Sequence, residues 1–216
     1  SEMCIRDRPY TIKRHQSQHH HPIISHRQFA SGTAIRKSLE NEDRLFESVV
    51  PAAVKQLYNK PHLTVEDCFP YLKYAILRAS PEELQHIHTV SEGFEHRLKA
   101  QILHSQSFDQ LMSQLKTKRY TYTRIQRMLM NILLNFKQAE KQDNVSAVRI
   151  LGMNEKGQAY LKSLKQQFPD RYYITNVNQS TAPYFKHEIQ ATTVYNWISG
   201  ETQDDFNTPV IRVQSE

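Results

Sequence analysis

Hydrophobic residues recur at steps of three and four positions through the middle of the chain, from about residue 41 to residue 140. This spacing places apolar side chains on one face of an α-helix, so it predicts a helical bundle over 41–140. The pattern is clearest over 121–139, where we predict the longest helix. Its apolar positions are Ile125, Met128, Leu129, Ile132, Leu133 and Phe136.

Three sequences in this region carry the residues that begin helices. The starts are Thr64, Ser80 and Ser107, each a hydroxyl residue followed three positions later by an acidic or amide residue. This is the capping-box pattern, and Pro81 stands at the first helical position after Ser80. Pro70 complicates the first turn of the helix that Thr64 opens.

The pattern changes on both sides of the bundle. Strands are predicted at 147–151 and 172–175, with a helix capped by Asn154 between them and a closing helix over 183–199. These elements predict a small α/β unit at the end of the chain. Before the bundle, 10–13 predicts a short strand, and Ser31 is the expected N-cap of a helix that runs to Leu39.

The composition gives the chain a net positive charge. The 216 residues carry a formal charge of +6, which favours a polyanionic partner such as nucleic acid but is also common in proteins without one. The two cysteines form no CxxC motif, and no run approaches the roughly 18 apolar residues of a membrane span. We therefore expect a cytoplasmic protein with no membrane partner.

The segment 9–39 contains five Lys and Arg residues, five histidines and no acid. Within it, Ser31, Thr33 and Arg36 stand at a predicted helix start. Hydroxyls, free N–H groups and the helix dipole favour an anion there, and Arg36 one turn later can reach the same anion with two N–H groups. The residues fit a phosphate site, or an ordinary capped helix with a surface arginine.

A second basic segment, 116–127, holds five positive charges in twelve residues, two tyrosines and no acid. Lysine and arginine neutralise RNA phosphates, and tyrosine rings stack on unpaired bases, so RNA binding and a solvated basic helix start are both open. Arg124 and Arg127 should share one face, opposite the apolar positions. The candidate RNA-binding residues are Lys116, Lys118, Arg119, Tyr120, Arg124 and Arg127.

Other chemically active residues predict no further site. The histidines at 15, 19, 20, 21 and 26 have no cysteine or carboxylate among them, so we predict no bound metal. Cys68, beside Phe69 in a helix, is expected to be a buried and inert thiol. Trp197 is expected to serve packing.

Two features carry a family resemblance. Residues 31–36 resemble the Ser-x-Thr-x-x-Arg motif of nucleotidyltransferases, which closes the ATP site opposite a His-x-Gly-His motif that occurs nowhere in this chain. From Pro9 to about Val213 the chain resembles the tRNA(Met) cytidine acetate ligase family. The residues that carry this resemblance are 9–14, 30–37, 71–74, 91–97, 115–121, 149–153 and 205–206.

The resemblance implies a mainly α fold with the remnant of an α/β nucleotidyltransferase domain, a helical bundle and a small α/β C-terminal unit. It implies 9–40 as the end of the ATP-binding domain, 41–140 as the tRNA-binding domain and 141–216 as the C-terminal domain. Residues 1–8 have neither helical nor strand periodicity and resemble a translated sequencing-adapter leader, so we expect them to be non-native. The catalytic residues would lie upstream, so we expect the chain itself to be inactive. Where the family shows Tyr-His-Asp, this sequence has His19, His20 and His21.

The activity that the resemblance implies is an ATP-dependent ligation. Acetate would be activated as acetyl-adenylate, with Mg²⁺ accompanying ATP, and transferred to the N4 amine of the wobble cytidine of elongator tRNA(Met). Arg14, Ser31, Thr33 and Arg36 would face ATP, and the basic segment 116–127 would face tRNA. The alternatives are a non-catalytic RNA-binding helical module and a different nucleotidyltransferase, which would leave residues 64–213 unexplained.

Overall fold

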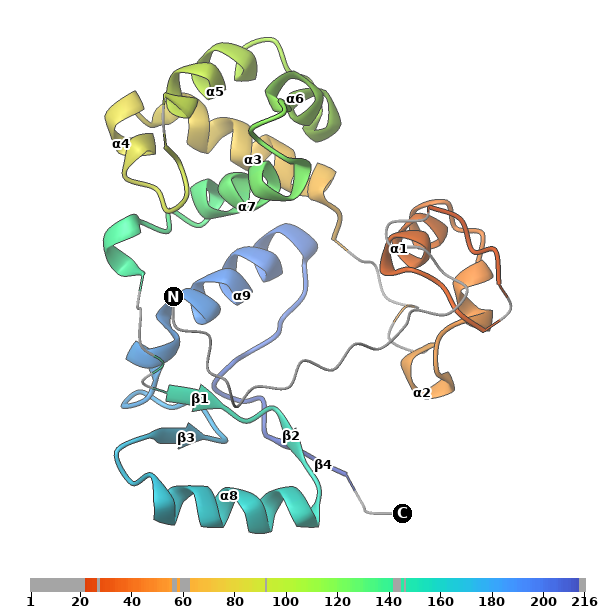
Figure 1. Cartoon of the computed structure of the whole chain (residues 1–216), viewed down its shortest axis with the longest axis vertical. Helices are drawn as coiled ribbons and strands as arrows, with labels where there is room; N and C mark the ends of the chain where they lie inside the picture. The colour runs from red at the N-terminus through yellow and green to blue at the C-terminus, as the bar shows by residue number, and fades with distance from the viewer. Residues whose placement is uncertain are drawn as a thin grey trace, which may run out of the picture. The chain divides into compact units, whose positions relative to one another are not determined.

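The computed structural model describes residues 22–26, 28–55, 58, 63–91, 93–141, 145 and 147–213. It divides the chain into two compact units, Ser1–His62 and Leu63–Glu216 (Figure 1). The strand predicted at 10–13 and the leader predicted at 1–8 lie outside the described residues. The domain boundaries predicted at residues 40 and 140 remain predictions.

The first unit contains helix α1 (Gly32–Glu40), the 3-10 turn η1 (Leu45–Ser48) and the short helix α2 (Ala52–Lys55). As predicted, Ser31 caps α1. Ser38 holds the segment after α1 against the helix, because its buried hydroxyl donates to Asp43 Oδ1 and accepts from the N–H of Phe46. Phe46 is itself buried, so α1 and η1 pack together.

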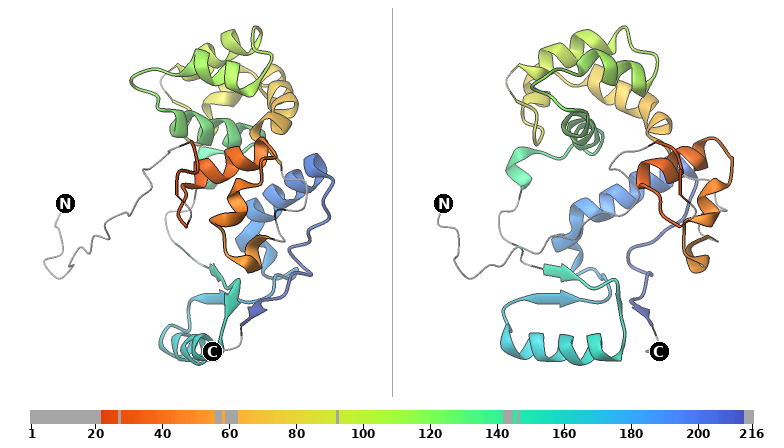
Figure 2. Two further views of the ribbon diagram at one scale, coloured as in Figure 1. Left: turned by 90° about the vertical axis from the view of Figure 1, so that its right-hand side faces the viewer. Right: turned by 45° about the vertical axis from the view of Figure 1, so that its right-hand side comes forward.

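The second unit begins with five helices: α3 (Val65–Arg78), α4 (Pro81–Gln85), α5 (Phe94–Ile102), α6 (Phe108–Leu115) and α7 (Tyr122–Leu133). They surround one apolar core, and Figure 2 shows the five helices grouped together. The predicted helical bundle is confirmed for the helices between Val65 and Leu133, whereas residues 41–62 belong to the first unit. Fully buried side chains come from every helix and include Leu72, Ile76, Leu84, Phe94, Leu98, Ile102, Phe108, Leu111, Leu115, Ile125 and Met128.

The predicted helix starts are confirmed at all three positions. Thr64 and Ser80 form complete capping boxes, and Pro70 is accommodated inside α3. Ser107 accepts from the N–H of Gln110, but the other half of its box differs from the expectation. The Gln110 side chain accepts from Gln106 instead, and the N–H groups of Phe108 and Asp109 at this end of α6 donate to the Glu66 carboxylate.

The prediction of a longest helix over 121–139 is wrong in its length. α7 ends at Leu133, and with 12 residues it is shorter than α3 and α9, which have 14 each. The cause is Asn135, which adopts left-handed backbone geometry with φ 50°. The N–H groups of Asn135 and Phe136 donate to Ile132 O at 3.0 Å and Asn131 O at 2.9 Å, which is a Schellman helix ending.

The chain then forms the turn η3 (Gln138–Glu140) and the predicted α/β elements: β1 (Ala147–Arg149), α8 (Glu155–Gln167), β3 (Tyr172–Ile174), η4 (Ala182–Phe185) and α9 (Lys186–Ser199). β1 pairs in parallel with β3. Two strands were not predicted: β2 (Gly152–Met153) and β4 (Ile211–Arg212), which also pair in parallel. A strand of two residues is too short to leave a periodic signal. The predicted mainly α class is confirmed.

Two segments that carry the family resemblance meet in this unit. The Arg149 guanidinium donates to the Asp205 carboxylate, and both side chains are largely buried. Burial alone would raise the pKa of Asp205, but hydrogen bonds from Arg149 and Thr192 and the charge of Arg149 lower it below its ordinary value. The ion pair therefore ties the C-terminal segment to β1. No helix in the described ranges is long and apolar enough to cross a membrane.

Candidate functional site

The N-terminus of α1 has the geometry expected of a phosphate site. Ser31 is extended, and its Oγ accepts from the N–H of Ala34 at 3.0 Å, while its carbonyl accepts from Ile35 at 3.1 Å. Among the described residues, the N–H groups of Gly32 and Thr33 have no acceptor. Two donors and the positive end of the helix dipole therefore point away from the helix.

Arg36 lies over this same turn. A Cβ atom built on Gly32 would be 3.4 Å from Nη1 of Arg36, so the guanidinium reaches back to the start of its helix. Arg36 is exposed and Thr33 is half-buried, which leaves both available to a ligand. The structure thus brings Ser31, Thr33 and Arg36 together. Arg14, the fourth residue predicted to face ATP, lies outside the described residues.

The second candidate site is the basic segment 116–127, where α6 ends and α7 begins. Lys116, Lys118 and Arg119 are exposed in the connection. Arg124 and Arg127 are exposed on α7, while Ile125, Met128 and Leu129 are fully buried. The two arginines therefore occupy the face of α7 that is turned away from the core, as the helical spacing predicted.

Tyr120 lies inside the bundle, directly beneath the exposed guanidinium of Arg124. It is only 8% exposed, and its hydroxyl donates to the Ser91 carbonyl at 3.1 Å. Its ring centroid is 4.7 Å from that of Phe94, and the Arg124 guanidinium carbon lies 4.8 Å from the ring centroid. One face of the ring is thus used by a cation–π contact, so Tyr120 positions Arg124 and offers little surface on which a base could stack.

The loop between α4 and α5 approaches the same surface, which the sequence did not predict. The N–H of His88 donates to Phe136 O at 2.8 Å, and Ile87 pairs with Lys137 in an isolated bridge. These contacts span about 50 positions in sequence and carry no local pattern. A groove of about 620 Å³ lies between this loop and the start of α7.

The remaining predictions from single residues have separate outcomes. Cys68 is buried, and burial raises the pKa of its thiol, as expected of an inert cysteine. Trp197 is 68% exposed, with its ring centroid 4.5 Å from that of Tyr71 on α3. Among the described residues no three His, Cys, Asp or Glu side chains gather as a metal site. Of the five histidines considered, only His26 is described, and its ring stacks on Phe29.

Comparisons with known proteins agree with the resemblance. A family model described as HIGH Nucleotidyl Transferase matches residues 5–208. The tRNA(Met) cytidine acetate ligase of Staphylococcus carnosus is 64% identical over 208 residues, covering 96% of this chain and 54% of that protein. The protein of the same name from Staphylococcus saprophyticus is 55% identical over 205 residues, covering 95% and 54%. The chain thus spans about half the length of the curated relatives it matches.

Solved structures show the same fold. The apo crystal structure of Thermotoga maritima TmcAL matches with a TM-score of 0.77 at 19% identity, covering 91% of this chain and 53% of that one. The crystal structure of the same protein bound with alpha-thio ATP matches with a TM-score of 0.75 at 19% identity, covering 87% and 53%.

Proposed function

The chain belongs to the HIGH nucleotidyltransferase family; we propose that it is part of a tRNA(Met) cytidine acetate ligase and supplies part of the ATP site and the tRNA-holding surface of that enzyme. The enzyme would activate acetate as acetyl-adenylate and transfer the acetyl group to N4 of the wobble cytidine of elongator tRNA(Met), in the cytoplasm. The observation that carries this proposal is the 64% identity with the S. carnosus ligase across both candidate sites.

At the ATP site, we assign the first turn of α1 to the phosphates. The free N–H groups of Gly32 and Thr33 and the guanidinium of Arg36 supply positive charge in one place, and residues 22–39 contain no carboxylate to oppose it. Arg14 would be a further cation for the same ligand. ATP would arrive with Mg²⁺ held by its phosphate oxygens, since residues 22–39 contain no acidic side chain that could bind that ion directly.

At the tRNA surface, we assign Lys116, Lys118, Arg119, Arg124 and Arg127 to the phosphates of the anticodon arm, with Tyr120 holding Arg124 in position. Such charge contacts supply much of the affinity of a protein for RNA and orient the substrate. The acetyl-transfer chemistry itself is not assigned to these residues. No His-x-Gly-His sequence occurs in the 216 residues, so we expect the isolated chain to show no ligase activity.

A chimera tests the proposal. In it, this chain replaces the matching 54% of the S. carnosus ligase, and acetylation of elongator tRNA(Met) is followed by mass spectrometry of its nucleosides. We expect acetylcytidine to form with ATP and acetate. Arg36→Gln in the chimera should raise KM for ATP by about 10-fold or more, since hydrogen bonds between charged groups contribute about 1.5–3 kcal/mol.

Lys37→Gln is the matched control, because Lys37 is the exposed neighbour of Arg36 on the same helix and carries the same charge. It should change KM for ATP by less than about 2-fold, the size of a screened surface charge effect. If both substitutions change KM for ATP equally, Arg36 is an ordinary surface arginine and does not bind the phosphates. A chimera that binds tRNA but forms no acetylcytidine would favour the alternative of a non-catalytic RNA-binding module.

A further inference from the structure

The groove between the α4–α5 loop and the start of α7 is lined by arginines and by Ser and Thr hydroxyls. Such a lining suits a polyanion that itself carries hydroxyl groups. Two arginines, Arg124 and Arg127, lie on its α7 side, and in the part of the chain that the structure describes it is lined by no carboxylate. The first turn of α7 has no acidic residue either. The full lining is Gln85, Thr89, Val90, Ser91, Thr121, Thr123, Arg124, Arg127 and Gln138.

The wall opposite the arginines is held rigidly. Thr89 adopts a left-handed backbone with φ 73°, which is strained for a β-branched residue. Asn131 on α7 maintains it by donating to His88 O at 3.0 Å and to Thr89 Oγ1 at 3.2 Å. The loop is thus fastened to the helix that carries the arginines, so the same side chain connects the two walls of the groove.

The arginine wall is fixed through Tyr120. The Arg124 guanidinium carbon lies 4.8 Å from the centroid of its ring, while its hydroxyl donates to the carbonyl of Ser91 on the opposite wall. One buried side chain therefore positions both sides of the groove. Arg127 lies three residues from Arg124, so their Cβ atoms should be about 5–6 Å apart on the same helix face. This spacing suits two neighbouring phosphates of one strand.

We propose that this groove binds the sugar–phosphate backbone of the RNA substrate and distinguishes RNA from DNA. Arg124 and Arg127 each contact a phosphate, and the hydroxyls of Ser91, Thr121 and Thr123 hydrogen-bond ribose 2′-hydroxyls. The carboxylates of an acidic peptide can only accept hydrogen bonds, whereas a ribose 2′-hydroxyl both donates and accepts, and Ser and Thr hydroxyls can match it in both roles. The inference rests on the proposed function in that tRNA is the RNA concerned.

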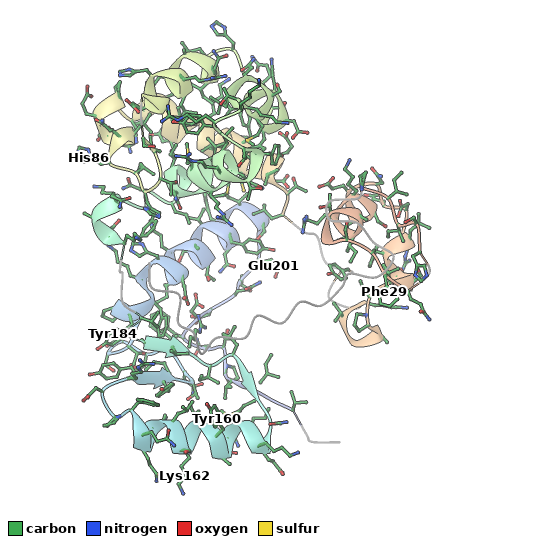
Figure 3. All side chains as sticks on the ribbon, viewed as in Figure 1. Phe29, His86, Tyr160, Lys162, Tyr184 and Glu201 are labelled. Atoms are coloured by element: carbon green, nitrogen blue, oxygen red, sulfur yellow. The ribbon has the colours of Figure 1, made fainter. Side chains whose placement is uncertain are left out.

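The first test measures binding by the 216-residue chain to elongator tRNA(Met) and to DNA of the same sequence, by fluorescence anisotropy over a salt series. Arg124→Gln with Arg127→Gln should weaken tRNA binding by about 10-fold or more at low salt and lower the log–log salt slope by roughly 1.5, as expected for two lost phosphate contacts. Lys162→Gln with Lys165→Gln is the matched control, an exposed pair with the same spacing on α8. Lys162 is labelled on this helix in Figure 3.

The control pair should change the affinity by less than about 2-fold, because its charges lie outside the groove. Thr123→Val should reduce the preference for RNA over DNA by several-fold and leave DNA binding unchanged. Equal losses from the two charge pairs, no tRNA binding by the unsubstituted chain, or tighter binding to a poly-glutamate peptide than to tRNA would each overturn the inference. A circular dichroism melt confirms that the variants are folded.

The chimera with the S. carnosus ligase separates this inference from the proposed function. If the Arg124 and Arg127 substitutions leave KM for tRNA unchanged in an active chimera, the groove is not the RNA site, yet the proposed function stands. If the chimera is inactive but the chain binds RNA through the groove in preference to DNA, the proposed function fails and the groove remains an RNA site. We expect an active chimera in which these substitutions raise KM for tRNA and leave KM for ATP unchanged.

Discussion

Lys99 binds three backbone carbonyls at one helix end. Its ammonium group on α5 donates to three carbonyls at the C-terminus of α3: Ile76 O at 3.0 Å, Leu77 O at 2.9 Å and Ala79 O at 2.8 Å. These carbonyls have no partner inside their own helix, and a cation is also favourable at the negative end of the dipole. Lys99 therefore joins α5 to α3 through polar contacts at the edge of the core.

Lys99→Met should destabilise the second unit by about 1–3 kcal/mol, because it removes charged hydrogen bonds while keeping a side chain of similar length. The measurement is the urea midpoint followed by circular dichroism. Lys165→Met, on the exposed face of α8, is the control and should lie within about 0.5 kcal/mol of the parent. If both variants unfold at the parental midpoint, the three hydrogen bonds contribute nothing to stability.

The helix caps could be predicted at this scale, and the partners of Lys99 and Tyr120 could not. Ser31, Thr64 and Ser80 bond to groups only three positions away, so the sequence contains both partners of each contact. Lys99 reaches back 20 to 23 positions, and the Tyr120 hydroxyl reaches back 29. Contacts of this range depend on how the helices pack, and a single sequence holds no local signal for them.

At the scale of elements, the end of α7 anchors the α4–α5 loop, which forms one wall of the groove. If the helix continued to residue 139, Phe136 O would bond within the helix instead of accepting from His88, and the α4–α5 loop would lose its anchor. The apolar periodicity over 121–139 continued past the true end, because Phe136 is half-buried against the rings of His88 and His187. Periodicity therefore indicated burial correctly and helix length incorrectly.

Substitutions at Asn135 test this helix ending. Asn135 is exposed and left-handed, a conformation that Gly and Asn adopt at much lower cost than other residues. Asn135→Ala should destabilise the unit by about 1 kcal/mol, whereas Asn135→Gly should be neutral or slightly stabilising. Urea unfolding compares the two variants. An alanine variant as stable as the glycine variant would mean that Asn135 is not under backbone strain in solution.

The candidate sites differed in the same way: a site formed by residues close together in sequence could be predicted, and a site that needs contacts between distant segments could not. The α1 turn is formed by residues 31–36 alone, so a motif was sufficient to bring them together. On α7, spacing placed both arginines on one exposed face. The groove needed a second wall from residues 85–91, and that wall depends on Asn131, on Tyr120 and on the early end of α7. Its existence could therefore be learned only from the structure.

At the scale of the second unit, helix α9 is docked against the bundle by a few polar and aromatic contacts. Lys186 Nζ lies 2.8 Å from the Glu140 carboxylate, and Gln190 donates to Leu134 O at 3.0 Å. At the other end of α9, the Trp197 ring contacts that of Tyr71. α9 has no fully buried residue of its own, so these contacts carry much of the attachment.

Glu140 makes this attachment sensitive to acid. The hydrogen bond from Lys186, then the bond from the N–H of Lys137 and the charges of Lys186 and His187, lower its pKa from an ordinary 4.5 to about 2. A group whose pKa is lowered by folding stabilises the folded state above its unfolded pKa, and that contribution is lost as the pH falls. The stabilisation should therefore be complete above about 4.5 and disappear towards about 2.

Trp197 is the sole tryptophan of the chain, so its fluorescence reports the docking of α9 on α3 directly. We expect Glu140→Gln to lower the urea midpoint of the Trp197 signal at pH 7 and pH 5.5, as charged hydrogen bonds to Lys186 and Lys137 are lost. The difference between parent and variant should narrow as the pH falls below about 4.5, be clearly smaller at pH 3, and vanish only towards about pH 2, where protonation gives the parent carboxyl the same neutral state. A difference that persists unchanged to pH 3 would show that Glu140 acts through packing and not through its charge.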